Sequence, residues 1–223
     1  MCGKFTQMTA WGQIINWSDI LASGKDIPVM PDAVTSVTPM RDAHVLHLDA
    51  QGARRVTRMR WGWSKPGSGQ AFARPDHIHA RAETIESRPT FRDAFRHRRG
   101  ILLVKSFNAG QPVSASKTLQ HVITPDDDKA LAIAVLWTVD SRDDEERYAF
   151  VMITVPANTL IGAVTDRMPA ILGPEDWSEW LGESPASPER LKALLRPVEG
   201  TWSMAREAKP TRAKPPSDPQ LPL

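Results

Sequence analysis

The chain has 223 residues, of which 41% are hydrophobic and 24% are charged, and its 28 lysines and arginines against 26 aspartates and glutamates give a formal net charge of +2. A chain this apolar is not disordered throughout, and so small a net charge excludes steering of ligands by a strongly positive overall field. The single cysteine, Cys2, excludes an intramolecular disulfide and a zinc site made of several thiolates. The sequence also lacks a dinucleotide-binding glycine motif and a Walker motif, so we expect no metal and no other cofactor.

No apolar run approaches the roughly 18–20 residues that a membrane span needs. The N-terminal segment MCGKFTQMTA lacks the hydrophobic centre of a secretory signal. We therefore expect a cytoplasmic globular protein without a membrane partner.

Charge is clustered although the total is small. Arginines gather at 54–60 and 96–99, and acidic residues gather at 126–128 and 143–146. The basic clusters could bind a polyanion locally, or they are the solvated faces of strands and turns. Charge alone leaves both interpretations open.

The first half of the chain predicts a helix, a loop, a hairpin and a second, short helix. Apolar residues recur at helical spacing over 9–23, and proline, glycine and aspartate over 24–42 indicate a loop. Strands are predicted at His44–Leu48 and Val56–Trp61, joined by a Gln-Gly turn as in a hairpin. Thr90 is a suitable N-cap for a short helix that carries two phenylalanines one turn apart.

Strands dominate the second half. Segments rich in apolar and β-branched residues predict strands at Ile101–Val104, His121–Thr124, Leu131–Val139 and Ala149–Val155. Pro174 and Pro188 stand at the first-turn positions of two predicted helices, 174–182 and 188–196. This order of elements predicts an α+β fold with mostly antiparallel sheets.

The end of the chain differs in composition from the rest. Residues 208–223 are rich in proline, which favours an extended or disordered tail. We expect one domain over residues 1–207, followed by this tail.

Cys2 follows the initiator methionine, and Gly3 comes next. Removal of Met1 would place an α-amine, with a pKa of about 7.7–8, and a thiol on the same residue. Such an aminothiol condenses with an aldehyde to an imine, and its thiol then closes a five-membered thiazolidine, a step that gains from proximity. The alternative is a free cysteine at a frayed terminus with no role.

Several short motifs then occur in an order that resembles one known family, the SOS response-associated peptidases (SRAP). The matching segments are MCGKFTQ at 1–7, WG at 61–62, HARAET at 79–84, PTFRDAF at 89–95 and DRMPAIL at 166–172. The match continues through Asp176-Trp177 and Trp180-Leu181, so the resemblance covers roughly residues 1–200.

The resemblance implies β-sheets curled into a barrel-like core with flanking helices. It also implies binding of single-stranded DNA, with a preference for abasic sites, where Cys2 forms a thiazolidine crosslink with the sugar aldehyde. The family name records a proposed self-processing peptidase activity that would expose Cys2. We expect a monomer that is cytoplasmic, and associated with the nucleoid if the source is bacterial.

The resemblance places DNA contacts on particular residues. Arg81 and Arg167 match DNA-contacting arginines, and Lys4 stands where the family has a third, which keeps the charge but loses bidentate geometry. Pro39 matches a proline of a family loop in which Ser36 replaces an asparagine. Beside these, Trp61 or its neighbour Trp63 could stack on a base, whereas Trp11, Trp17, Trp137, Trp177 and Trp180 are expected in the core.

The proton-transfer groups of the family are replaced. In an alignment with the family, Ala109 stands at the position of a catalytic glutamate, and Thr165 stands at the position of a catalytic histidine. Acid–base groups contribute about 10²–10⁴-fold to such chemistry, so we expect crosslinking by Cys2 to be slowed or absent. His79, in place of an asparagine, either shuttles the proton or merely fills the position of that amide. Glu83 is expected to be a structural partner for an arginine.

Two other functions remain open. The first is a non-catalytic relative that acts as a DNA-binding or interaction module. The second is an N-terminal-nucleophile amidotransferase, a class that also begins with a processed Cys-Gly, but its glutamine-binding motifs are missing here.

Overall fold

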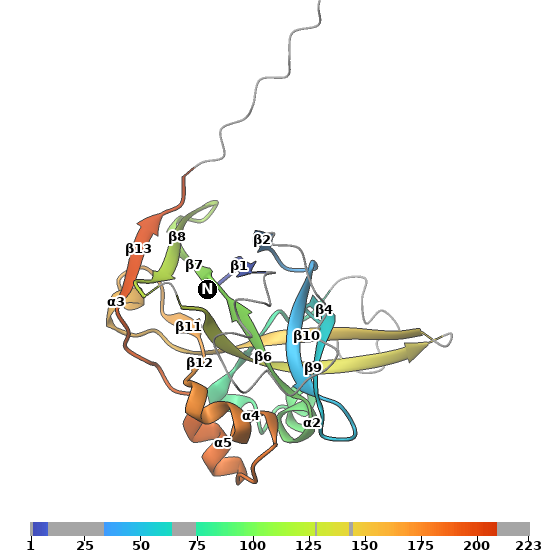
Figure 1. Ribbon diagram of the computed structural model, residues 1–223. Coiled ribbons are helices and arrows are strands. Elements are labelled where there is room, and N and C mark those ends of the chain that lie inside the picture. The colour runs from blue at the N-terminus through green and yellow to red at the C-terminus, as the bar shows by residue number, and fades with distance from the viewer. Residues whose placement is uncertain (1, 9–33, 64–74, 128, 143–144, 209–223) are drawn as a thin grey trace, which may run out of the picture.

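In a computed structural model the chain folds into two β-sheets with short helices (Figure 1). The structure describes residues 2–8, 34–63, 75–127, 129–142 and 145–208. The smaller sheet has the strand order β13-β8-β7-β1-β2. Its strands are β1 (Phe5–Met8), β2 (Val34–Val37), β7 (Ser106–Ser114), β8 (Lys117–Pro125) and β13 (Trp202–Arg206).

The larger sheet closes on itself. Its order is β11-β10-β4-β3-β6-β9-β12, and β10 also pairs with β9, so β4, β3, β6, β9 and β10 form a closed ring. Its strands are β3 (Asp42–Leu48), β4 (Arg54–Trp61), β5 (His79–Arg81), β6 (Arg99–Val104), β9 (Leu131–Arg142), β10 (Glu145–Pro156), β11 (Arg167–Pro169) and β12 (Ile171–Leu172). Closure leaves the ring without exposed edges, and it confirms the barrel-like core expected from the resemblance.

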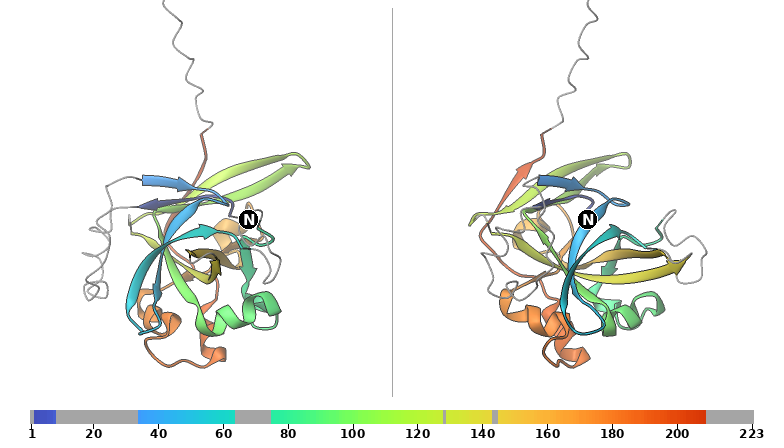
Figure 2. Two further views of the ribbon diagram at one scale, coloured as in Figure 1. Left: turned by 90° about the vertical axis from the view of Figure 1, so that its right-hand side faces the viewer. Right: turned by 45° about the vertical axis from the view of Figure 1, so that its right-hand side comes forward.

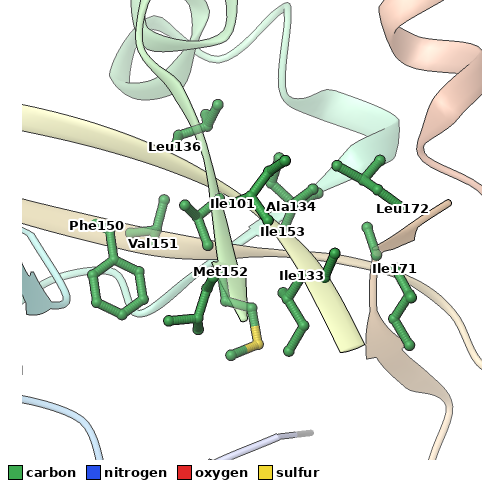
Figure 3. Close-up of a cluster of buried hydrophobic side chains, with 14 of the residues drawn as sticks. Ile101, Ile133, Ala134, Leu136, Phe150, Val151, Met152, Ile153, Ile171 and Leu172 are labelled. Atoms are coloured by element: carbon green, nitrogen blue, oxygen red, sulfur yellow. The ribbon is translucent and has the colours of Figure 1, made fainter. Parts of the chain in front are cut away.

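Apolar side chains cover both faces of the central barrel strands (Figure 3). Ile133 of β9 and Met152 of β10 share one face of the sheet, Ile101 of β6 lies on the other, and all three are fully buried. Burial of each large apolar side chain contributes roughly 1.5–3 kcal/mol relative to exposure. These strands read as nearly continuous apolar runs because both of their faces are covered.

Helices cover the end of the barrel away from the smaller sheet (Figure 2). They are α2 (Pro89–His97), α4 (Trp177–Leu181) and α5 (Pro188–Leu194), while η1 (Ala82–Thr84), α3 (Thr159–Gly162) and η2 (Pro174–Asp176) are single turns elsewhere. Trp180 of α4 donates from Nε1 to the Gly100 carbonyl at 2.9 Å, and Arg99 donates to the Trp180 carbonyl at 2.5 Å. These bonds join α4 to β6.

The predicted elements mostly agree with the structure. The hairpin is β3–β4, and each of the four predicted later strands lies within a longer or equal strand. Trp177 and Trp180 are buried, as expected, and Trp137 is partly buried against the core. No helix among the described residues is long and apolar enough to cross a membrane.

Some predictions need correction. The loop predicted over 24–42 is longer than the structure allows, because Val34–Val37 pairs with Phe5–Met8 as strand β2. The helix expected after Thr90 begins at Pro89, whose ring favours the first helical turn. The helix predicted at 9–23, with Trp11 and Trp17, lies outside the described residues. So does the tail from residue 209, so the domain boundary stays a prediction.

Replacing Gly100 with alanine tests the close packing of β6 on β3. A Cβ there would lie 2.8 Å from Val45 Cγ1 and 3.0 Å from the Leu46 carbonyl oxygen. We expect Gly100→Ala to lower the free energy of unfolding by about 1–3 kcal/mol in denaturant titration. Gly162→Ala is the control, because a Cβ at Gly162 meets nothing within 4 Å. Equal midpoints for the two variants would contradict this packing.

Candidate functional site

The thiol of Cys2 is buried, with 3% of the residue exposed. Its Sγ donates a hydrogen bond to the Lys4 carbonyl oxygen at 3.3 Å. Burial disfavours the thiolate and raises the pKa of Cys2 to about 11. The thiol is therefore protonated at neutral pH, and it needs a base before it can act as a nucleophile.

Strand β1 holds the start of the chain against the beginning of β7. Phe5 pairs with Phe107, and the Asn108 amide donates to the Lys4 carbonyl at 2.8 Å. Continuing this antiparallel register one step brings Gly3 beside Ala109. The structure thus brings the N-terminal residues next to Ala109, and the alignment of Ala109 with a catalytic glutamate stays a prediction.

His79 lies directly against Cys2. Its imidazole makes a hydrogen bond with the backbone of Cys2, and it meets the ring of Trp61 edge-on at 5.9 Å between centroids. Burial lowers the pKa of His79 to about 4, although that hydrogen bond opposes the shift. The imidazole is therefore neutral at pH 7, and its buried Nε2 has no hydrogen-bond partner among the described residues.

Two arginines of the site flank β10 on opposite sides. Arg81 ends β5, which runs parallel to β10, and Arg167 begins β11, which is antiparallel to β10. Arg167 is 9% exposed and contacts both carboxylate oxygens of Glu83, at 2.5 and 2.9 Å, as well as the Thr154 carbonyl at 2.7 Å. The Arg167 hydrogen bond lowers the pKa of Glu83.

The roles of these two arginines therefore differ. Glu83 pairs with Arg167, as expected of a structural partner. Arg81 is exposed beside this pair, and its charge contributes to the lowered pKa of Glu83. Among the two, Arg81 has the geometry of a surface contact and Arg167 that of a buried support.

Lys4 lies in a network that joins three strands. Its Nζ forms an ion pair with Glu207, and Asn108 Nδ2 donates to the same carboxylate at 3.1 Å. The Glu207 amide in turn donates to the Gln120 carbonyl at 2.8 Å. No local signal in the sequence indicates Glu207 or Asn108, because Lys4 and its partner Glu207 are 203 residues apart.

The other candidate residues are spread around this centre. Trp61 is fully buried, donates from Nε1 to the Ile78 carbonyl at 2.9 Å and packs on Phe5 at 5.1 Å, so it belongs to the core. Ser36 is exposed on β2, and Pro39 lies in the turn after it. Thr165 is half-buried between α3 and β11. DNA contacts by these residues, and a catalytic role for the position of Thr165, stay predictions.

The described residues include no cluster of three or more His, Cys, Asp or Glu side chains that could hold a metal ion. The chemistry that the arrangement can perform is that of an organic nucleophile: a thiol, an adjacent imidazole and a nearby guanidinium.

The buried thiol predicts an unusual alkylation profile. Because Cys2 is the single cysteine, iodoacetamide labelling followed by mass spectrometry reports on this thiol alone. With a pKa of about 11, the labelling rate of the native protein should still be rising above pH 9. In urea it should level off near the ordinary value of about 8.5, with a rate at pH 7 roughly 300-fold higher than in the native state. A native profile that levels off near pH 8.5 would contradict the burial.

Comparison with known proteins gives this site a context. A family model described as SOS response associated peptidase (SRAP) matches residues 1–210. The abasic site processing protein YoqW of Bacillus subtilis (strain 168) is 28% identical over 203 residues, covering 89% of this chain and 88% of that protein. The abasic site processing protein YedK of Escherichia coli (strain K12) is 27% identical over 193 residues, covering 81% and 79%.

Solved structures agree on the fold. A crystal structure from Bordetella bronchiseptica has a TM-score of 0.73 at 19% identity and covers 93% of this chain and 100% of that one. Another, from Bacteroides thetaiotaomicron, has a TM-score of 0.71 at 20% identity and covers 92% and 91%. With the family match extending over nearly all of the described residues, the chain belongs to the SOS response-associated peptidase family.

Proposed function

We propose that this protein binds single-stranded DNA at abasic sites and forms a covalent thiazolidine with them through Cys2. The observation that carries the proposal is the placement of Cys2, whose backbone hydrogen-bonds with the His79 imidazole. The names of the relatives YoqW and YedK, both abasic site processing proteins, support the choice of substrate.

The proposed reaction needs no oxidant. After removal of Met1, the Cys2 amine adds to the aldehyde carbon of the open-chain sugar, and loss of water gives an imine. The thiol sulfur then bonds to the imine carbon, and its proton passes to the nitrogen, which closes the thiazolidine ring. Both steps are assisted by proximity, because the amine and the thiol belong to one residue.

His79 is suited to accept a proton rather than to donate one. A pKa of about 4 leaves its imidazole neutral at pH 7, and its buried Nε2 has no hydrogen-bond partner among the described residues. Ala109 and Thr165 carry no group that transfers protons at neutral pH. We therefore expect slower capture than a complete acid–base pair would give, by a factor within the usual 10²–10⁴.

The DNA strand would contact the exposed face around Arg81. A guanidinium there binds a phosphate with bidentate geometry. Arg167 would act indirectly, since its hydrogen bonds to Glu83 and to the Thr154 carbonyl of β10 hold both in place. Lys4 reaches a phosphate only in competition with its carboxylate partner, Glu207.

A second candidate function is a DNA-binding module without covalent chemistry. The burial of the Cys2 thiol favours it, because the native state keeps the nucleophile protonated and covered. The two functions differ in one product, a DNA–protein bond that survives denaturation.

The crosslink test uses mature protein whose loss of Met1 is confirmed by intact mass. Incubation with a single-stranded oligonucleotide that carries one abasic site should give a band on a denaturing gel, and an oligonucleotide without the site should give none. Cys2→Ala keeps the α-amine but lacks the thiol, so it should give a band only when borohydride reduces the imine. No band with the wild type, or a stable Cys2→Ala band without borohydride, would contradict the thiazolidine.

Substitution of Arg81 tests the DNA contact. We expect Arg81→Ala to weaken binding of single-stranded DNA across sequences and to reduce the slope of log K against log salt by about 1. Arg92→Ala, which removes an exposed arginine of α2, is the matched control and should bind like the wild type. Equal affinities and salt slopes for the two variants would place the DNA elsewhere.

A further inference from the structure

A row of residues crosses the smaller sheet beside Cys2. In the strand register, Arg206 of β13 pairs with His121 of β8, and His121 pairs with Ala109 of β7. Gly3 follows next to Ala109, as the bond from the Asn108 amide to the Lys4 carbonyl shows. Strands β7 and β8 lie side by side in Figure 1. The row therefore runs from the exposed Arg206 to the start of the chain.

The side chains of this row point to the face of the sheet that carries the core. Paired residues share a face, and so do residues two positions apart on one strand. Phe107 and Ile123 are paired and fully buried, and they stand two positions from Ala109 and His121 respectively. Ala109 and His121 are thus on the buried face, with Cβ atoms about 4.5–5.5 Å apart.

The backbone of Cys2 contacts residues on the same side. Its neighbour His79 packs on Trp61, and Trp61 packs on Phe5, which pairs with Phe107. Along this row of described residues, Ala109 and Gly3 stand between His121 and Cys2, and both have small side chains. A Cβ built on Gly3 would meet nothing within 4 Å, so there is open space at this point.

His121 has an unused hydrogen-bonding atom. Its Nδ1 is shielded from solvent and has no partner among the described residues, although the ring as a whole is only half-buried. A buried polar atom without a partner is uncommon in folded proteins, and a bound substrate is one way to supply the missing partner.

We propose that His121 is the acid–base group that serves Cys2 in this protein, acting from β8 across the small side chain of Ala109. The inference rests on the proposed function, because it assigns a proton donor to the same covalent reaction. His79 is a poor donor at neutral pH, so without His121 the proton donation in this reaction lacks a group.

The steps balance in protons. The Cys2 amine adds to the aldehyde, and a proton shift gives a neutral carbinolamine. Protonated His121 gives its proton to the carbinolamine hydroxyl. The C–O bond then breaks, water departs, and an iminium ion remains. The neutral imidazole then takes the thiol proton as the S–C bond forms, which yields the neutral thiazolidine and restores the imidazolium.

The test separates covalent capture from binding. Affinity is measured with an oligonucleotide that carries a tetrahydrofuran abasic analogue, which has no aldehyde. Capture is measured as the single-turnover crosslinking rate at saturating protein with a true abasic site. We expect His121→Gln to slow capture about 10- to 100-fold at unchanged affinity and unchanged thermal midpoint. His97→Gln, on the exposed side of α2, is the matched control and should crosslink like the wild type.

A second variant moves the acid along the row. Ala109→Glu combined with His121→Gln places a carboxylic acid one strand nearer to Cys2, and it should recover at least part of the lost rate. A wild-type rate for His121→Gln, with stable crosslinking still abolished in Cys2→Ala, would overturn the role of His121 and leave the proposed function intact. A rate that falls only together with affinity or thermal midpoint would show a structural role and would also overturn it. Absence of crosslinking in the wild type would overturn both.

Discussion

The pairing of β10 with four neighbours is the constraint on which the rest of the molecule depends. It closes the barrel against β4 and β9, and near its C-terminal end it also holds β5 and β11. These two short strands carry the arginines of the site, and β5 also carries His79. A three-residue strand has little stability of its own, so its position is set by the long strand beside it. The site is therefore built at the edge of the barrel's most connected strand.

Much of this fold can be predicted from the sequence where the signal is local. Continuous apolar runs identify β6, β9 and β10, and a Gln-Gly turn between two short runs identifies the β3–β4 hairpin. Strand β2 could not be found in this way, since four residues in a proline-rich stretch become a strand only because β1 is there to pair with them. Pairing between distant segments has no local signature.

The site was predictable to a similar extent. The order of short motifs singled out Cys2, His79, Arg81 and Arg167, and the structure brings His79 against the Cys2 backbone and Arg81 beside the Arg167–Glu83 pair. It could not show that Arg167 is enclosed by Glu83 and Thr154, or that Lys4 shares its charge with Glu207. A motif fixes which residue types occur and in which order, whereas the partner that neutralises a charge is chosen by the packing of strands far apart in the chain.

The Lys4–Glu207 pair has a consequence for the order in which the protein matures. Cys2 and Lys4 are among the first residues to leave the ribosome, but their surroundings come from β7, β8 and β13, and β13 is the last described strand. Synthesis proceeds at about 5–20 residues per second, so the N-terminal segment waits for on the order of ten seconds or more before its final partner exists. During that interval an enzyme that trims methionine meets an uncovered terminus. Once Glu207 arrives, its ion pair with Lys4 joins the last described strand to the start of the chain.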